Sequence, residues 1–450
     1  MKIAVGMMLC AGIFPVTLFA ESTLSVEQRF LLLEARLKKA ENRADRAEAE
    51  MVKLKQNTRE DNAATAHTGT TPPLAVSLNT PAELRFYGDV EFNADAASRT
   101  GSLTSLKTSS NKSWAPGNKE RWDINGRILL GVEGIRQGSA GKYAGFNVQP
   151  LADIRGKMNL DDAAFFFGQK DNWQVKTGRF EAWDMFPLNQ DTFIEYSGNT
   201  ANDLYSDGYG YIYMMKEARG RSNSGGNLLL SQTWDKWYVE VNTLIEDGSA
   251  LYVDQRYHGR TMENQKNVMY VRPVVAWRSD IWSVAAAMES NIVNNAYGYT
   301  DREGRWRDQS ERTGYGLTMT WNTLKNNPQN GTVVNVNTAY MDAREETDFS
   351  AGINALWHRV ELGYIYAHNN IAEFSASGVS EECTADCAIF QPGRYDIHTL
   401  HTSWQLPDIL DMPNFTVYLG GYASWLNAAD DDRGNHQPRY GARVRAKYLF

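Results

Sequence analysis

The C-terminal stretch Arg439–Phe450, "RYGARVRAKYLF", carries two opposite faces. From Tyr440 onward every second residue is apolar or small, and Arg443, Arg445 and Lys447 lie between them. Alternation with a period of two predicts a β-strand. A strand with lipid on one face and a water-filled lumen on the other accounts for both the cations and the terminal aromatic residues. A basic edge strand of a soluble protein accounts for the cations alone.

The same alternation recurs along most of the chain. It is clear in "LRFYGDVEF" (84–92), "RWDINGRILLGV" (121–132), "WYVEVNTLI" (237–245), "YGLTMTW" (315–321) and "TVVNVNTAY" (332–340). Tight turns alternate with long connections, and tryptophans flank the tight turns, as at Trp234, Trp237 and Trp357. Indole rings favour a membrane interface, where one side is apolar and the other is wet. The pattern predicts an all-β fold, a transmembrane antiparallel β-barrel. We expect 18 strands, with 16 as the alternative because strands near 209, 215 and 352 are weak.

The N-terminal segment differs from the rest in its periodicity. Residues 1–20 are typical of a signal peptide, with a lipid anchor at Cys10 as the less favoured alternative. Residues 21–56 carry apolar residues at alternating spacings of three and four, which predicts a periplasmic α-helical coiled coil; a single amphipathic helix is the alternative. Its seam is rich in alanine, so we expect other contacts to hold an oligomer together. Residues 57–82 form a polar linker, and the barrel occupies 83–450.

Charge and cysteine content narrow the possible partners and cofactors. The formal net charge of −8 argues against a nucleic-acid partner. Cys383 and Cys387 lie close together in an exported chain, which favours a disulfide in a loop. A metal site is the alternative, but no second cysteine pair or histidine cluster accompanies them. We therefore expect no cofactor and no metal.

One long connection is the candidate constriction of the channel. It follows the fifth predicted strand, from Gly178 to Tyr205, and is rich in aromatic and acidic residues. Aromatic rings meet the faces of sugars and polar side chains meet their hydroxyls; packing against the barrel wall is an equal alternative. The candidate contacts are Trp183, Asp184, Phe186, Asp191, Phe193, Glu195 and Tyr196. The candidate lumen charges are Asp89, Glu91, Arg127, Arg179, Arg443, Arg445 and Lys447, with the loop acids facing the arginines across the channel.

The order of signal peptide, coiled coil, linker and barrel resembles sucrose-type porins, which are relatives of maltoporin. "FYGDVEFNA" (86–94) is similar to the first maltoporin strand, and "WQVKTGRFEAWDMFPLNQDTFIEYSG" (173–198) to its fifth strand and inward-folded third loop. The overall resemblance is to the raffinose glycoporin type. It implies a homotrimeric oligosaccharide channel in the outer membrane of a Gram-negative bacterium. Asp89 and Leu449 stand where maltoporins carry aromatic residues, which implies a wider, weakly selective pore.

The favoured function is passive diffusion of raffinose- or sucrose-like oligosaccharides and small polar solutes; the alternative is a general ion-permeable porin. An outer-membrane enzyme is disfavoured because no histidine accompanies a recognisable nucleophile motif. His398 and His401 are three residues apart in one strand, so they should face opposite sides. An adhesin is disfavoured because the coiled coil precedes the barrel. Expected partners are two further copies of the chain, membrane lipid and the barrel-insertion machinery, which would recognise Phe450.

Overall fold

The computed structural model of the protein describes residues 74–77, 82–98, 121–188, 212–221, 224–252, 255–257, 260–301, 303–328, 330–372, 393–428 and 439–450. The signal peptide, the coiled coil, the Cys383–Cys387 pair and most of the linker lie outside these residues. Within the expected linker, β1 (Leu74–Ser77) pairs with the start of the next strand. No helix in the described part of the chain is long and apolar enough to cross a membrane.

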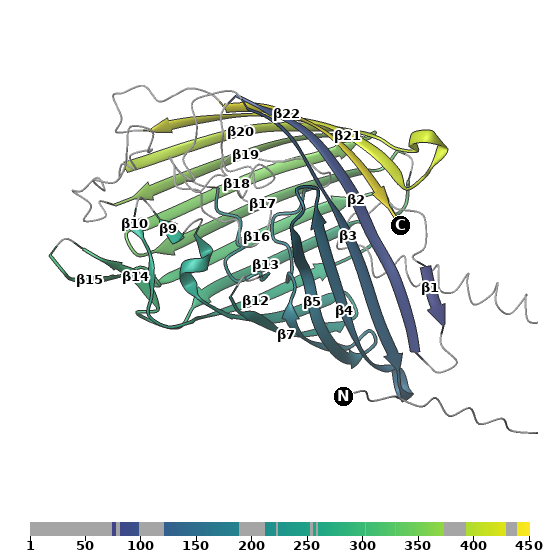
Figure 1. The fold of residues 1–450 in the computed structure, drawn as a ribbon, viewed down its shortest axis with the longest axis horizontal. Coiled ribbons are helices and arrows are strands. Elements are labelled where there is room, and N and C mark those ends of the chain that lie inside the picture. Colours follow the sequence, from purple (N-terminus) through teal and green to yellow (C-terminus); the bar gives the residue numbers. More distant parts are fainter. Residues whose placement is uncertain are drawn as a thin grey trace, which may run out of the picture. The chain divides into compact units, whose positions relative to one another are not determined.

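The described residues form a closed antiparallel barrel (Figure 1). Its strands are β2 (Ala82–Ala97), β3 (Arg121–Gln137), β4 (Lys142–Asp153), β5 (Met158–Gln169), β6 (Trp173–Arg179), β7 (Gly226–Trp234), β8 (Trp237–Glu246), β12 (Val268–Arg278), β13 (Trp282–Asn291), β16 (Arg312–Asn322), β17 (Thr332–Ala343), β18 (Glu346–Trp357), β19 (Val360–Ile371), β20 (Gly393–Leu406), β21 (Phe415–Ala428) and β22 (Arg439–Leu449). Each strand pairs with its neighbours in the chain, and β22 returns to pair with β2.

The expected count of 18 strands was wrong, and the alternative of 16 is confirmed. The sheet has 17 strands, and removing the four-residue β1 leaves a ring of 16. The strand near 352 is present as β18. The pair near 209 and 215 has no place in the ring, because β6 and β7 bond directly to each other. Position 215 lies in a segment folded inside the barrel, and position 209 lies outside the described residues.

The connections give the barrel two different ends. At one end, which we call the turn end, seven connections are short, among them 170–172, 235–236 and 358–359. The other, the loop end, has two short turns, 154–157 and 344–345. The remaining connections at this end are long. They contain small elements: β9 (Arg256–Tyr257), β10 (Arg260–Thr261), β11 (Glu263–Asn264), β14 (Tyr297–Thr300), β15 (Trp306–Asp308) and the 3-10 turn η3 (Gly248–Leu251). The turn end carries two further short 3-10 turns, η2 (Ser139–Gly141) and η5 (Ile409–Asp411).

Outward-facing side chains follow the alternation of the sequence. On β22 the exposed Val444 alternates with the buried Arg443 and Arg445, as the opening stretch predicts. At the turn end the outer face carries a tryptophan belt, which consists of Trp173, Trp234, Trp237, Trp277, Trp282, Trp321, Trp357 and Trp404. The belt extends from β6 to β20. Among the described residues, β21, β22 and β2–β5 carry no tryptophan at the turn end.

Candidate functional site

The connection between β6 and β7 turns into the barrel instead of leaving it. The structure describes its two arms, 180–188 and 212–221. The arms are joined at their base. Glu181 and Gly220 form an isolated antiparallel β-bridge, and the Ala182 N–H donates to the Arg219 carbonyl at 2.8 Å. Beyond this base both arms are tied to inward-facing side chains of the opposite strands. We call these two arms the inner loop.

A buried arginine of β12 holds both arms of the inner loop. The Arg272 guanidinium donates to the Trp183 carbonyl at 2.8 Å and to the Met215 carbonyl at 3.4 Å. It lies near two buried carboxylates, Glu240 at 3.6 Å and Glu289 at 3.5 Å. Because buried charges are stable only when paired and hydrogen-bonded, this arrangement fixes the position of the loop backbone.

The returning arm carries its own acid, Glu217, into a second buried pair. Arg312 of β16 lies 2.7 Å from the Glu217 carboxylate and also donates to the Tyr257 hydroxyl at 3.0 Å. The side chains of this pair are 1% and 2% exposed. On the same arm the Tyr213 hydroxyl donates to Glu289 at 2.6 Å. The returning arm is therefore anchored by charge-assisted hydrogen bonds at two points.

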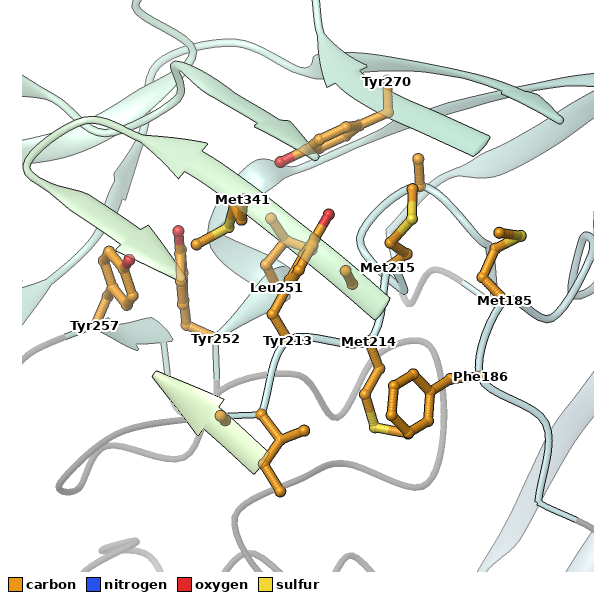
Figure 2. Packing of buried hydrophobic residues seen from close by; sticks show 14 of the residues in the cluster. Met185, Phe186, Tyr213, Met214, Met215, Leu251, Tyr252, Tyr257, Tyr270 and Met341 are labelled. Carbon is orange, nitrogen blue, oxygen red and sulfur yellow. The ribbon is translucent and has the colours of Figure 1, made fainter. Parts of the chain in front are cut away.

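Glycines on the inner faces of β16 and β18 make room for the inner loop. A Cβ atom at Gly314 would stand 1.7 Å from the Tyr213 hydroxyl oxygen, and one at Gly316 would stand 2.1 Å from the Met215 sulfur. A Cβ at Gly352 would stand 2.8 Å from the Phe186 ring. Figure 2 shows these loop side chains within a cluster of tyrosines and methionines. β12, β13, β17, β19 and β20 contribute side chains to this cluster, and β16 and β18 face the inner loop with glycines. We call these seven strands the packed wall.

The three candidate contacts on the described arms have different environments. Trp183 is partly buried; its ring stacks on Tyr238 at 5.2 Å, and the Arg278 guanidinium lies 4.3 Å from the ring centre. The Asp184 side chain is 34% exposed and lies 3.4 Å from Arg219. Phe186 is 4% exposed and packs against the wall. The candidates Asp191, Phe193, Glu195 and Tyr196 lie outside the described residues.

Charge is concentrated where the first and last strands meet, which we call the charged seam (β22, β2 and β3). Arg443 pairs with Asp95 at 2.6 Å, and Arg445 pairs with Glu91 at 3.2 Å. Lys447 lies 3.9 Å from Glu91, and Arg127 lies 3.3 Å from Asp89. Strand register explains these pairs, because Asp95 stands opposite Arg443 and Glu91 stands opposite Lys447. The cations of the seam thus have acidic partners on the adjacent strands.

Arg179 has a different position from the seam cations. It ends β6, and its guanidinium donates to the carbonyls of Leu160, Asp161 and Arg221 at 2.8–2.9 Å. β5 continues beyond β6 as Met158–Asp162, so these contacts cover part of an edge that β6 leaves unpaired. Arg221 adds ion pairs to Asp161 and Asp162 at 3.1 and 2.9 Å. Arg179 therefore closes the wall at the root of the inner loop.

Electrostatics keep the base of the inner loop charged. Burial lowers the pKa of Arg219, but the neighbouring carboxylates of Asp184 and Glu181 raise it, and the net direction is upward. Arg219 therefore remains a cation beside Glu181 and Asp184. The described part of the chain has no group of His, Cys, Asp or Glu side chains suited to hold a metal ion.

Sequence reasoning missed the residues that anchor the inner loop. Arg272, Arg312 and Glu289 occupy inward positions of their strands. A charged residue at an inward position with apolar neighbours could have marked them as candidate anchors. Their partners cannot be read from spacing, because Glu217 and Arg312 are 95 residues apart. The inward positions of Asn93 and Asp95 could have been predicted from the sequence, since these residues continue the polar face of Asp89 and Glu91.

Comparison with known proteins identifies the family. A family model described as "Porin-like glycoporin RafY" matches residues 86–450. No curated protein matches the chain. Similar solved structures include the outer membrane protein OmpT of Vibrio cholerae in trimer form (10% identity, 82% of this chain, 99% of that chain, TM-score 0.48). Others are an anion-selective porin from Comamonas acidovorans (13%, 82%, 100%, 0.48) and a mutant of the Rh. blastica porin (11%, 82%, 100%, 0.44). The protein is a multi-pass β-barrel of the outer membrane, and the chain belongs to the porin-like glycoporin RafY family.

Proposed function

We propose that this porin passes oligosaccharides of the raffinose and sucrose class by facilitated diffusion without chemistry. One observation carries the proposal: Trp183 of the inner loop is partly buried, stacks on Tyr238 and lies 4.3 Å from the Arg278 guanidinium, and the next residue, Asp184, pairs with Arg219. An aromatic ring beside charged hydrogen-bonding groups fits a sugar, which has apolar faces and a polar rim. The description of the family as a glycoporin supports the same substrate class.

Single-channel conductance in a planar bilayer tests this proposal. Raffinose, sucrose and maltotriose are titrated into wild-type channels and into the Trp183→Ala variant. We expect saturable block of the wild type and, in the variant, block weakened about tenfold, as loss of an aromatic contact of about 1 kcal/mol or more predicts. Trp306→Ala, in the β14–β15 hairpin at the loop end, is the matched control. Block by none of the sugars, or equal block in both tryptophan variants, would refute the role of Trp183.

A general ion-permeable porin is the second candidate. The charged seam favours it, because the seam offers both signs of charge along one wall and Asp89 stands where an aromatic contact would be needed. Such a pore would discriminate by size and charge alone. The same titration separates the two functions: conductance steps that no sugar reduces support the ion-permeable porin.

We also propose a homotrimer assembled through the β2–β5 sector. The tryptophan belt is absent there. β3 extends beyond β4, because β4 pairs with β3 only as far as Arg127. On this extension Trp122 and Ile124 are 79% and 71% exposed. Exposed apolar side chains beside an unpaired strand edge favour burial against another copy. Sedimentation in detergent should give trimers for the wild type and smaller species for Trp122→Asp combined with Ile124→Asp.

The alanine-rich seam of residues 21–56 gives a further test of this assembly. A chain lacking these residues should still sediment as a trimer with unchanged conductance, since we place the main contacts on the barrel. Dissociation to monomers after the deletion would assign the assembly to the coiled coil.

For insertion we propose that Phe450 is read by the barrel-insertion machinery. Its backbone exchanges hydrogen bonds with Gly88, at 3.0 and 3.1 Å, and its ring stacks on Tyr448 at 6.4 Å. Phe450→Ala should lower the amount of folded protein in the membrane while leaving refolding in detergent unchanged. Equal losses in both experiments would assign Phe450 to stability instead.

A further inference from the structure

The outer face of β19 and β20 carries a group of ionisable side chains. Tyr364, Tyr366 and His368 lie on the outward positions of β19, and Asp396 and His398 lie on those of β20. We call these five residues the outer imidazole cluster. His401, three residues after His398, is buried on the inner face, as the spacing predicts. Ionisable groups on the lipid-facing side of a barrel are costly unless they have a partner at the membrane surface.

The hydrogen bonds inside the cluster orient both imidazoles. Nδ1 of His368 lies 2.8 Å from Oδ1 of Asp396, and the Tyr366 hydroxyl donates to the same oxygen at 2.7 Å. The Tyr364 hydroxyl lies 2.7 Å from Nδ1 of His398. A carboxylate only accepts, so Nδ1 of His368 carries a proton and donates it. Neither Nε2 atom has a hydrogen-bond partner among the described residues, so both imidazoles keep one edge for an external group.

The cluster lies near the loop-end boundary of the membrane. His368 is eight residues beyond Val360, which pairs with Trp404 of the tryptophan belt. At about 3.3 Å per residue and a tilt of about 40°, it stands roughly 20 Å above the belt, against an apolar band about 25 Å tall. Outward aromatic side chains flank it, with Phe349 on β18 and Trp425 on β21. This is the depth at which lipid headgroups meet the protein.

Lipid, and not a second copy of the chain, is the occupant that this sector favours. The tryptophan belt is continuous below the cluster at Trp357 and Trp404, whereas it lapses in the β2–β5 sector. Arg394, two residues before Asp396 and also outward, is exposed. An exposed guanidinium and two imidazole edges on the same outer face suit an anion. We propose that Arg394, His368 and His398 bind the phosphate of a phosphorylated glycolipid headgroup in the outer leaflet.

Native mass spectrometry of the detergent-solubilised protein tests the proposal. The wild type is titrated with diphosphorylated lipid A and with fully dephosphorylated lipid A. We expect the diphosphorylated lipid to bind more tightly, and His368→Gln combined with His398→Gln to weaken it about tenfold through loss of two charge-assisted contacts. Arg344→Gln is the matched control, because Arg344 is an exposed cation outside the cluster, and we expect it to have little effect.

Other outcomes contradict the proposal in distinct ways. Equal affinity for dephosphorylated lipid A would show that the phosphate does not contribute to binding. Competition by millimolar inorganic phosphate alone would assign the site to the free ion. A changed oligomeric state in the double variant, with lipid binding retained, would assign the face to a second copy. If the double variant does not fold, Arg394→Gln leaves the internal hydrogen bonds intact and should weaken binding about threefold by removing one cation; unchanged binding in that variant would overturn the proposal.

Discussion

The packed wall and the charged seam face the same barrel interior but differ in what their inward side chains contact. On β12–β20 the inward positions include tyrosine, methionine, alanine and glycine residues that pack against the inner loop, and the charged Arg272, Glu289 and Arg312 that anchor it. On β22, β2 and β3 the inward positions hold Arg443, Arg445, Glu91 and Asp95, which pair with one another across strands. The packed wall depends on a segment distant in sequence, whereas the described ion pairs of the seam follow from strand register. The two regions should therefore respond differently to substitution.

The largest effect is expected from Arg312→Met in the packed wall. This change leaves Glu217 as an uncompensated buried charge, which should destabilise the folded barrel by about 3–5 kcal/mol. Because Glu217 anchors the returning arm, the open-channel conductance should also rise. Urea unfolding followed by gel mobility and bilayer recording measure the two effects. Arg344→Met removes an exposed pair with Glu311 and should cost no more than about 1 kcal/mol. Equal costs for the two variants would contradict the anchoring role.

A smaller effect is expected from Arg443→Met in the charged seam. Asp95 would keep the hydrogen bond from Asn125 at 2.7 Å, so the cost should be about 2–3 kcal/mol. Conductance should change less than in the Arg312 variant, because the described ion pair of Arg443 is with Asp95 on the adjacent strand and not with the inner loop. Loss of a lumen cation should shift selectivity toward cations. Reversal potentials in a salt gradient measure this shift. A rise in conductance like that of Arg312→Met would erase the distinction between the two regions.

The glycines of the packed wall give a third comparison. Gly314→Val places side-chain atoms where the Tyr213 hydroxyl lies, and overpacking of this kind costs about 1–3 kcal/mol. Gly420→Ala, at a strand position near the seam, meets only the Thr402 carbonyl at 3.8 Å and should be nearly neutral. Thermal unfolding of both variants tests the difference. Unchanged stability of Gly314→Val would show that the inner loop moves at little energetic cost to accommodate the side chain.

The smallest effect concerns the β14–β15 hairpin at the loop end. Hydrogen bonds from the Arg305 backbone, then from the side chains of Arg307 and Arg305, lower the pKa of Asp301 to about 2. A lowered pKa stabilises the hairpin above the ordinary range near pH 4, and this contribution is lost as the pH falls through 2. Hydrogen exchange of residues 297–308, corrected for its intrinsic pH dependence, should increase between pH 4 and 2. Asp301→Asn should remove this dependence, and unchanged protection in the wild type would contradict the prediction.

The strands themselves could be predicted because their information is local. Alternation places Val444 outward and Arg443 inward whatever the rest of the chain does, since a β-strand directs successive side chains to opposite faces. The tryptophans beside tight turns are equally local, and they form the belt. The 18-strand count failed near 209 and 215 because the described arm around position 215 is apolar like a strand but packs inside the barrel. Its apolar residues contact the wall and not lipid.

The residue pattern is enough to predict the barrel, its two faces, the basic inner face of the last strand and the inward-folded loop as the candidate constriction. Which acid pairs with which cation depends on the three-dimensional arrangement of the strands and the loop. The pairing of Arg443 with Asp95 needs the register of the first strand against the last, and that of Glu217 with Arg312 needs the loop to cross the interior. Tertiary packing also separated Trp183, which stays partly accessible, from Phe186, which is buried. Contacts between distant segments depend on how the closed ring positions them, and local periodicity contains no record of that arrangement.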